Sequence, residues 1–271
     1  MTVIMTDSTS DFTLDEAKEL NVEMISLKVN FGSEYFADKT EISAEDFYEK
    51  MKNTEQLPTT CLVSVGEFID VFNAHPNEEI VLITLSSELS GTNNSAHMAK
   101  DQLKRDDILI VDSRTAAIGL NLLVRLAVDM RTQGVLARDI AYHIEQICPR
   151  VRVIVVLETL ENLIKGGRLS STKGRVATML SLKLIIEVDN GIVHDIGKAR
   201  GFKTAMRKAA DIVHADEMDK YYPIAYASAL NEEGLAAFVA LIGRDGVHMS
   251  LGSVVGVHTG SGAVAVAYFR K

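Results

Sequence analysis

The sequence predicts an α/β protein of two domains: an N-terminal three-layer domain with a parallel sheet, and a C-terminal domain with a mixed or antiparallel sheet. In the first half, apolar strand-like segments alternate with segments of helical spacing, which is typical of parallel sheets covered by helices. In the second half, Asn190-Gly191 separates two strand-like segments and indicates a hairpin, because both turn positions favour a positive φ. The 271 residues suffice for two domains, and we place them at residues 1–150 and 151–271.

The chain begins with a strand, a helix and a second strand. The first strand covers residues 3–6 and ends in Asp7-Ser8-Thr9-Ser10. Thr13 and Glu16 form a capping-box pair ahead of apolar residues at helical spacing, which predicts a helix. Residues 22–31 then alternate in polarity as a strand does.

The same signals continue to residue 150. Ser43 with Asp46, and Ser64 with Glu67, predict the starts of two further helices. Apolar strands are expected over residues 80–85 and 108–111, and helices over residues 92–103, 115–131 (closed by Gly134) and 136–148.

The second half mixes hairpins with helices. We expect strands over residues 151–157, 182–188, 192–198, 223–228, 252–258 and 263–269. Helices are expected over residues 160–164 (ended by Gly166-Gly167), 173–180, 203–214 and 232–242.

Composition excludes several classes of protein. Hydrophobic residues make up 47% and charged residues 24%, as in ordinary globular proteins. The net charge of −9 opposes nucleic-acid binding, and we interpret the basic run from Lys198 to Lys208 (Lys198, Arg200, Lys203, Arg207, Lys208) as solvated surface or a partner-docking patch. Two cysteines exclude a disulfide framework, and no signal peptide or transmembrane segment is apparent, so we expect a cytoplasmic protein.

Three predicted strands of the first half end in hydroxyl-rich loops. These are Asp7-Ser8-Thr9, Ser86-Ser87-Glu88-Leu89-Ser90-Gly91-Thr92 and Asp112-Ser113. Ligands of open α/β sheets bind beyond the carboxyl ends of the strands. In addition, the helix predicted to begin at Ser90-Gly91-Thr92 offers free N–H groups to a carboxylate or phosphate. The alternative is that Ser90 or Thr92 only caps its helix.

Two loops of the second half have similar potential. In Lys165-Gly166-Gly167-Arg168 the glycines allow a sharp turn that presents the Arg168 guanidinium to an anion; the alternative is a glycine C-cap followed by a solvated basic loop. In His258-Thr259-Gly260-Ser261-Gly262 we expect His258 to end a strand beside hydroxyl groups, in either a binding or a structural role. Histidine and cysteine spacings predict no metal site.

Six segments, in order along the chain, carry a family resemblance. They are Asp7-Ser8-Thr9-Ser10-Asp11, Ser86-Ser87-Glu88-Leu89-Ser90-Gly91-Thr92, Val111-Asp112-Ser113, Leu163-Ile164-Lys165-Gly166-Gly167-Arg168, Gly197-Lys198-Ala199-Arg200 and Gly256-Val257-His258-Thr259-Gly260-Ser261-Gly262. With them the chain resembles, over essentially its full length, the DegV family of bacterial fatty-acid-binding proteins.

The resemblance implies a function. Members of the family hold one long-chain fatty acid in a buried tunnel between two domains and present its carboxyl group to a separate ATP-dependent kinase, which makes an acyl phosphate for phospholipid synthesis. The chain is thus expected to be a lipid-binding carrier with no cofactor and no catalytic residue of its own. By motif position, Thr60 and Ser90 hold the carboxyl group, with Arg168 and His258 beside it. Gly91, Thr92 and Thr259 belong to the same binding motifs, and Arg168 and Arg200 support phosphoryl transfer.

The chain departs from the family in one segment of this site. Where the family usually has Thr-Ser-Gln-Pro-Ser, this chain has Thr60-Cys61-Leu62-Val63-Ser64, and Ser261 stands where proline is frequent. Thr60 is retained, but the polar residues that follow it in the family are replaced by Cys61 and Leu62. We expect this replacement to change the polarity of the pocket and the acyl chain that it prefers.

Two other functions stay open at this stage. One is a sensor of a lipid or small anion that works without a kinase. The other is a self-sufficient phosphotransferase, which is opposed by the absence of a Walker A loop, a clustered acidic Mg²⁺ site and a G-x-S-x-G elbow.

Overall fold

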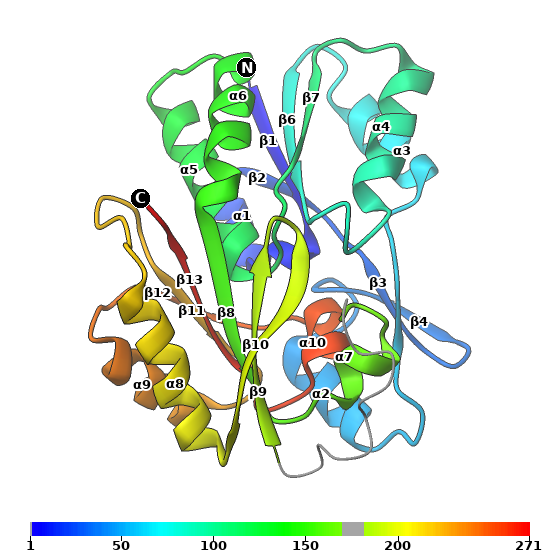
Figure 1. Cartoon of the computed structure of the whole chain (residues 1–271). Helices are drawn as coiled ribbons and strands as arrows, with labels where there is room; N and C mark the ends of the chain where they lie inside the picture. The colour runs from blue at the N-terminus through cyan, green and yellow to red at the C-terminus, as the bar shows by residue number, and fades with distance from the viewer. Residues whose placement is uncertain (1, 170–181) are drawn as a thin grey trace.

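The computed structural model describes residues 2–169 and 182–271, and its first sheet is the predicted parallel one (Figure 1). This sheet has the strand order β2-β1-β6-β7, and every neighbouring pair is parallel. Its strands are β1 (Thr2–Asp7), β2 (Val22–Ile25), β6 (Glu79–Thr84) and β7 (Ile108–Asp112).

Helices cover both faces of the parallel sheet, which confirms the predicted three-layer architecture. In Figure 1, α5 and α6 lie on one side of β6 and β7, and α3 and α4 lie on the other. The elements of this region are η1 (Ser8–Ser10), α1 (Leu14–Glu19), α3 (Val65–Ala74), α4 (Thr92–Leu103), α5 (Ile118–Thr132), α6 (Ala137–Ile147) and η2 (Cys148–Arg150). The predicted caps at Thr13 and Ser64 are present as full capping boxes, and Ser43 accepts a bond from the Asp46 N–H group.

The second sheet is mixed, as predicted for the second half of the chain. Its order is β10-β9-β8-β13-β11-β12, and all neighbours are antiparallel except β11 and β12. The strands are β8 (Val151–Leu157), β9 (Leu182–Asp189), β10 (Ile192–Arg200), β11 (Ala225–Ser228), β12 (Val247–Ser250) and β13 (Val264–Phe269). Asn190 and Gly191 have φ of 47° and 84°, so the predicted hairpin turn is confirmed.

The two faces of the mixed sheet bury different sets of side chains. Helices α8 (Phe202–Ala215) and α9 (Glu232–Ile242) cover the outer face, where Ile154 and Val156 pack. Val153 and Val155 belong instead to the core shared with the parallel sheet. This alternation along β8 leaves an apolar inner face turned toward the first half of the chain.

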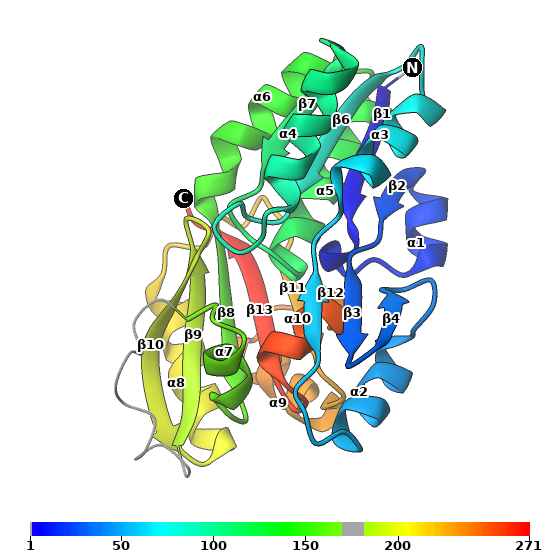
Figure 2. The ribbon, with the colours of Figure 1, turned by 90° about the vertical axis from the view of Figure 1, so that its right-hand side faces the viewer.

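A third, smaller sheet lies below the parallel sheet and beside α2 (Figure 2). It consists of β3 (Lys28–Phe31), β4 (Glu34–Ala37) and β5 (Thr59–Cys61), in the antiparallel order β4-β3-β5. The nearby helices are α2 (Ala44–Lys52), α7 (Glu161–Lys165) and α10 (Ser253–Thr259). None of the described helices has the length and hydropathy that crossing a membrane needs.

The single strand predicted over residues 22–31 is wrong, because the chain changes sheets in its middle. β2 pairs with β1, whereas β3 pairs with β4 and β5. The break is fixed by side chains, since Ser26 Oγ donates to the Asp38 carbonyl and Leu27 N donates to Ser8 Oγ. The short strands β4, β5 and β12 are not among the predicted elements.

The strand predicted over residues 252–258 is also wrong, because Ser253–Thr259 forms α10. Its valines favour strands intrinsically, but packing overrides this preference. Val254 and Val257 are buried, and the helix contacts α2 and α7. His258 therefore lies in the last turn of a helix. The helix predicted over residues 173–180 lies outside the described residues.

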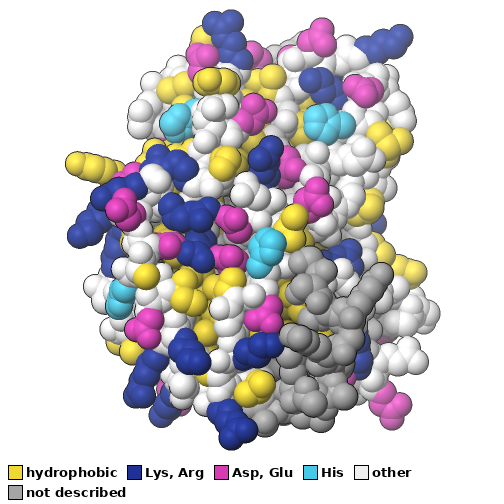
Figure 3. Space-filling model, in the orientation of Figure 1, with side chains coloured by type: hydrophobic (Ala, Val, Ile, Leu, Met, Phe, Trp, Pro, Cys, Tyr) yellow, Lys and Arg dark blue, Asp and Glu magenta, His cyan; other side chains and the backbone are white. Residues whose placement is uncertain are grey.

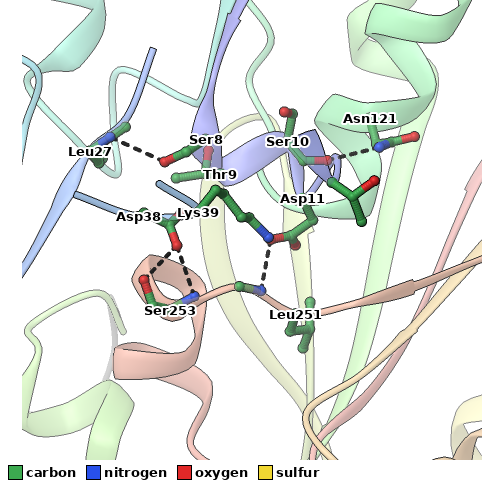
Figure 4. A network of polar contacts seen from close by, with 12 residues as sticks. Ser8, Thr9, Ser10, Asp11, Leu27, Asp38, Lys39, Asn121, Leu251 and Ser253 are labelled. Carbon is green, nitrogen blue, oxygen red and sulfur yellow. Dashed lines mark hydrogen bonds and ion pairs between the residues drawn. The ribbon is translucent and has the colours of Figure 1, made fainter. Parts of the chain in front are cut away.

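A buried polar network holds the start of α10 against the first half of the chain (Figure 4). Tyr48 Oη donates to the Leu251 carbonyl, and Gly252 N donates to Asp11 Oδ1 at 2.8 Å. Ser253 donates to Asp38 Oδ1 twice, from its N–H group (3.2 Å) and from its hydroxyl group (2.5 Å). Three consecutive residues are thus fixed by side chains more than 200 positions away in sequence.

Burial dominates the electrostatics of this network. It raises the pKa of Asp11 to about 7, although Lys39 Nζ lies 3.5 Å away and opposes the shift. Burial likewise raises the pKa of Asp7 to about 6. Since both pKa values lie above the ordinary value of 3.8, these groups favour folding at low pH, and their contribution is lost as the pH rises through 6 and 7.

Ser253→Ala should lower the free energy of unfolding by about 1–3 kcal/mol, because it removes one of the donors to a buried carboxylate. Urea denaturation measures this loss. Ser33→Ala, at an exposed position, is the matched control and should change the free energy by less than about 0.5 kcal/mol. Equal effects of the two substitutions would contradict the role given to the network.

Candidate functional site

A cavity lies between the inner face of the mixed sheet and the ends of the parallel strands. The centre of a water molecule can occupy about 190 Å³ of it. Its walls come from the mixed sheet, from β5 of the third sheet, from the loops after β1, β6 and β7, and from α10. The apolar lining residues are Leu27, Leu62, Leu85, Leu89, Ala116, Ala117, Val153, Val155, Leu163, Ile186, Val188, Val193, Leu251, Val254, Val255 and Ala265.

The hydroxyl-rich loops that follow the parallel strands converge at this cavity. Asp7 joins two of them, since its carboxylate accepts from Thr9 N (3.0 Å) and from Leu85 N (2.7 Å). Ser87 Oγ donates to Asp112, which joins the second loop to the third. The sheet is parallel, so its strand ends meet on one edge, as expected from the sequence.

Polar groups of four separate segments also line the cavity: Thr60, Ser90, Arg168 and His258. Thr60 Oγ1 lies 3.4 Å from His258 Nε2, which brings β5 and α10 together. Ser90 precedes α4, and its Oγ lies 2.9 Å from Thr92 Oγ1 and accepts from Thr92 N at 3.3 Å. Ser90 thus accepts from the first N–H group of α4 and also lines the cavity, while Gly91 is the N-cap residue.

Arg168 lies at the exposed side of the cavity. Its Nε donates to the Leu89 carbonyl at 3.2 Å, and its Nη1 donates to the Gly166 carbonyl at 2.6 Å. These two bonds tie the loop after α7 to the loop after β6 and fix the guanidinium beside Ser90. A cation in this position favours an anionic ligand.

Gly166 ends a helix and also packs against His258. It is the C-cap of α7. It also lies against His258, because a Cβ atom on Gly166 would stand 2.4 Å from His258 Nδ1. Any larger residue would displace the imidazole, so the loop and the histidine form one packed unit.

His258 is held in the neutral form. Burial, together with the smaller effect of the neighbouring Arg168 charge, lowers its pKa to about 4. Its Nδ1 atom has no hydrogen-bond partner among the described residues. The site therefore offers hydroxyl donors, one cation and a neutral imidazole.

The other predicted site residues have different positions. Gly91 and Thr259 line the cavity, whereas Thr92 is buried behind Ser90. Arg200 is exposed at the end of β10 and is not a lining residue. Exposed Lys203, Arg207 and Lys208 follow it on α8, where Lys and Arg side chains gather at the lower left of Figure 3.

Several cavity residues escaped the sequence analysis. The sequence offers six apolar candidates for a tunnel and does not separate them from ordinary core: Leu163, Ile186 and Val255 line the cavity, Leu182 and Leu184 do not, and Met179 lies outside the described residues. Thr9 belongs to the first hydroxyl-rich loop, whereas no sequence signal marked Leu27, because its position depends on the break between β2 and β3.

The arrangement suits a ligand with a long apolar part and one anionic end. Across residues 2–169 and 182–271, no three His, Cys, Asp or Glu side chains gather as a metal site requires. The polar lining residues offer hydrogen bonds and charge to a ligand in this apolar cavity.

Comparison with known proteins matches the whole chain. Residues 1–271 match the family model described as "Uncharacterised protein, DegV family COG1307". A DegV domain-containing protein of Clostridium acetobutylicum is 33% identical over 273 residues, which span 99% of this chain and 98% of that protein.

Solved structures agree with the fold. A DegV family protein from Thermus thermophilus, described by its fatty acid binding, has a TM-score of 0.89 at 25% identity, covering 100% of this chain and 99% of that one. DegV from Bacillus subtilis, described as a fatty acid binding protein, has a TM-score of 0.87 at 26% identity with the same coverage. A Ruminococcus gnavus relative refined with vaccenic acid has a TM-score of 0.87 at 25% identity, covering 98% and 99% of the two chains.

The buried neutral His258 should make stability depend on pH. As the pH falls from 6.5 to 4, the His258 imidazole takes up a proton in the unfolded chain but not in the folded ligand-free protein. The free energy of unfolding should therefore fall by up to about 3 kcal/mol relative to that of His258→Gln. Urea denaturation across this range measures the difference. His97→Gln, at an exposed position, should track the wild type. A constant difference between wild type and His258→Gln would contradict the burial of a neutral imidazole.

Proposed function

The chain belongs to the DegV family, and from this premise we propose that it binds one long-chain fatty acid in the cavity and presents the carboxylate to a separate ATP-dependent kinase. One observation carries the proposal: an apolar cavity has Thr60, Ser90, Arg168 and His258 among its few polar lining residues. The lining comes from both sides of residue 150, in accord with a ligand held between the two predicted domains.

The acyl chain supplies most of the binding free energy. Each buried CH₂ group contributes about 0.8 kcal/mol, so a long chain gains on the order of 10 kcal/mol before the entropic cost of binding. The valines of β8, β9, β10 and α10, with Ile186 of β9, provide apolar surface for this burial. A small hydrophilic anion would not contact most of this apolar surface.

The carboxylate end is held by donors. Thr60 and Ser90 each have a hydroxyl group to donate, and a bond to an ionised acceptor contributes about 1.5–3 kcal/mol. Arg168 adds Coulombic attraction. A carboxylate beside His258 also raises the imidazole pKa from its depressed value, so binding is accompanied by proton uptake.

The solved relatives support this assignment. The Thermus thermophilus and Bacillus subtilis proteins are described as binding fatty acids, and the Ruminococcus gnavus structure was refined with one. All three share the fold over nearly the whole chain. The carrier is expected to act in the cytoplasm and to have no catalytic group of its own.

Transfer to a kinase requires an accessible carboxylate. One carboxylate oxygen attacks the γ-phosphorus of ATP held by the kinase, the bond to the bridging oxygen breaks, and ADP leaves. Arg168 lies on the exposed side of the cavity, where it offsets the charge of two approaching anions. Arg200, exposed at the end of β10, is proposed to face the kinase rather than the fatty acid.

Ser90→Ala should weaken fatty-acid binding about tenfold or more, because it removes one donor to the carboxylate. Isothermal titration of the delipidated protein with a long-chain fatty acid measures the affinity. Ser33→Ala should leave it unchanged. Unchanged binding by Ser90→Ala would place the carboxyl group elsewhere, and no binding by any variant would refute the proposed function.

Arg168→Ala should retain the fatty acid but abolish acyl-phosphate formation with an ATP-dependent fatty acid kinase, because it removes the charge that supports transfer. The assay compares phosphorylation with the fatty acid retained after gel filtration. Arg138→Ala, whose side chain is 75% exposed, is the matched control and should be phosphorylated normally. Loss of the bound lipid in Arg168→Ala would show that this arginine anchors the ligand instead.

A further inference from the structure

Leu62 occupies an unusual position between cavity and solvent. It follows β5, and Thr60 and Leu62 both line the cavity while Val63 is fully buried elsewhere. This is the alternation expected of an extended segment. Leu62 is nevertheless 44% exposed, so one side of its side chain faces the cavity and the other faces water. It therefore forms part of the rim.

The side chain of Leu62 lies over the start of α4. A Cβ atom on Gly91 would stand only 2.9 Å from Leu62 Cδ2. Gly91 adjoins Ser90 and begins the helix without a side-chain cap of its own. The space that the absent side chain leaves at Gly91 is thus where Leu62 packs, directly beside the hydroxyl group proposed to hold the ligand.

We propose that Leu62 covers one side of the carboxylate end: it packs on Gly91 and keeps bulk water from that side of the bound carboxyl group, while the side beside exposed Arg168 stays open. The inference rests on the proposed binding of fatty acid. A leucine at this place forms no hydrogen bond with the ligand, and it excludes the water that a polar residue would hold there. Because excluding water lowers the local dielectric constant, the hydrogen bonds from Thr60 and Ser90 to the carboxylate are stronger.

The cover has a measurable electrostatic consequence. Removing water disfavours the ionised carboxylate and raises the pKa of the ligand's carboxyl group, whereas a cation beside it lowers that pKa. Of the described lining residues, the charged or titratable ones are Arg168 and His258. Both are unchanged in variants of Leu62, so the difference between variants isolates the effect of the cover.

The test is a pH titration of [1-¹³C]palmitate bound to the full chain, followed by the ¹³C chemical shift of the carboxyl carbon. Leu62→Gln and Leu62→Ala should lower the pKa of the bound carboxyl group by about one unit relative to the wild type, because both admit water. Leu62→Met keeps an apolar cover and should titrate as the wild type does.

Leu136→Gln is the matched control, since Leu136 is 52% exposed and does not line the cavity. It should leave the titration unchanged. The same carboxyl pKa in wild type, Leu62→Gln and Leu62→Ala would overturn the proposed cover while leaving fatty-acid binding intact. The absence of a bound carboxyl signal from every variant would instead refute the proposed function.

Discussion

The burial of Asp11 and Asp38 against the segment before α10 is the constraint on which the rest of the structure depends. A carboxylate taken out of water costs several kcal/mol unless donors surround it, and here the donors are main-chain N–H groups, a hydroxyl group and Lys39. These donors fix the first residue of α10. The helix then carries Val254 and Val255 into one wall of the cavity and His258 to its polar end. Asp7 does the same for another wall by holding Thr9 and Leu85.

The site itself combines two opposed requirements. An acyl chain needs a dry apolar surface, while its carboxyl group needs donors and charge. Both are met because the polar lining residues come from β5, from loops and from the end of α10, whereas the strands of the mixed sheet supply valines and Ile186. His258 reflects this compromise, since burial keeps it neutral until an anion arrives. Leu62 extends the apolar surface to the rim.

Much of the fold was predictable where local signals agree with tertiary packing. The capping boxes at Thr13 and Ser64 and the Asn190-Gly191 turn are local, and each appears as expected. α10 was mispredicted as a strand because its valines favour extended structure, whereas contacts with distant parts of the chain, among them Asp38 and α2, favour the helix. The same holds for the site. Motif order pointed to Thr60, Ser90, Arg168 and His258, which do line one cavity, but the rim contact of Leu62 with Gly91 depends on the approach of two loops that no local pattern encodes. The division into domains at residue 150 stays a prediction.

The most direct test of the central claim is to denature the purified full chain in organic solvent and identify what is released by mass spectrometry. The account predicts one long-chain fatty acid per chain, and the identity of its acyl chain would show what the cavity prefers. A chain that releases no fatty acid, even after incubation with a panel of saturated and unsaturated fatty acids, would contradict it.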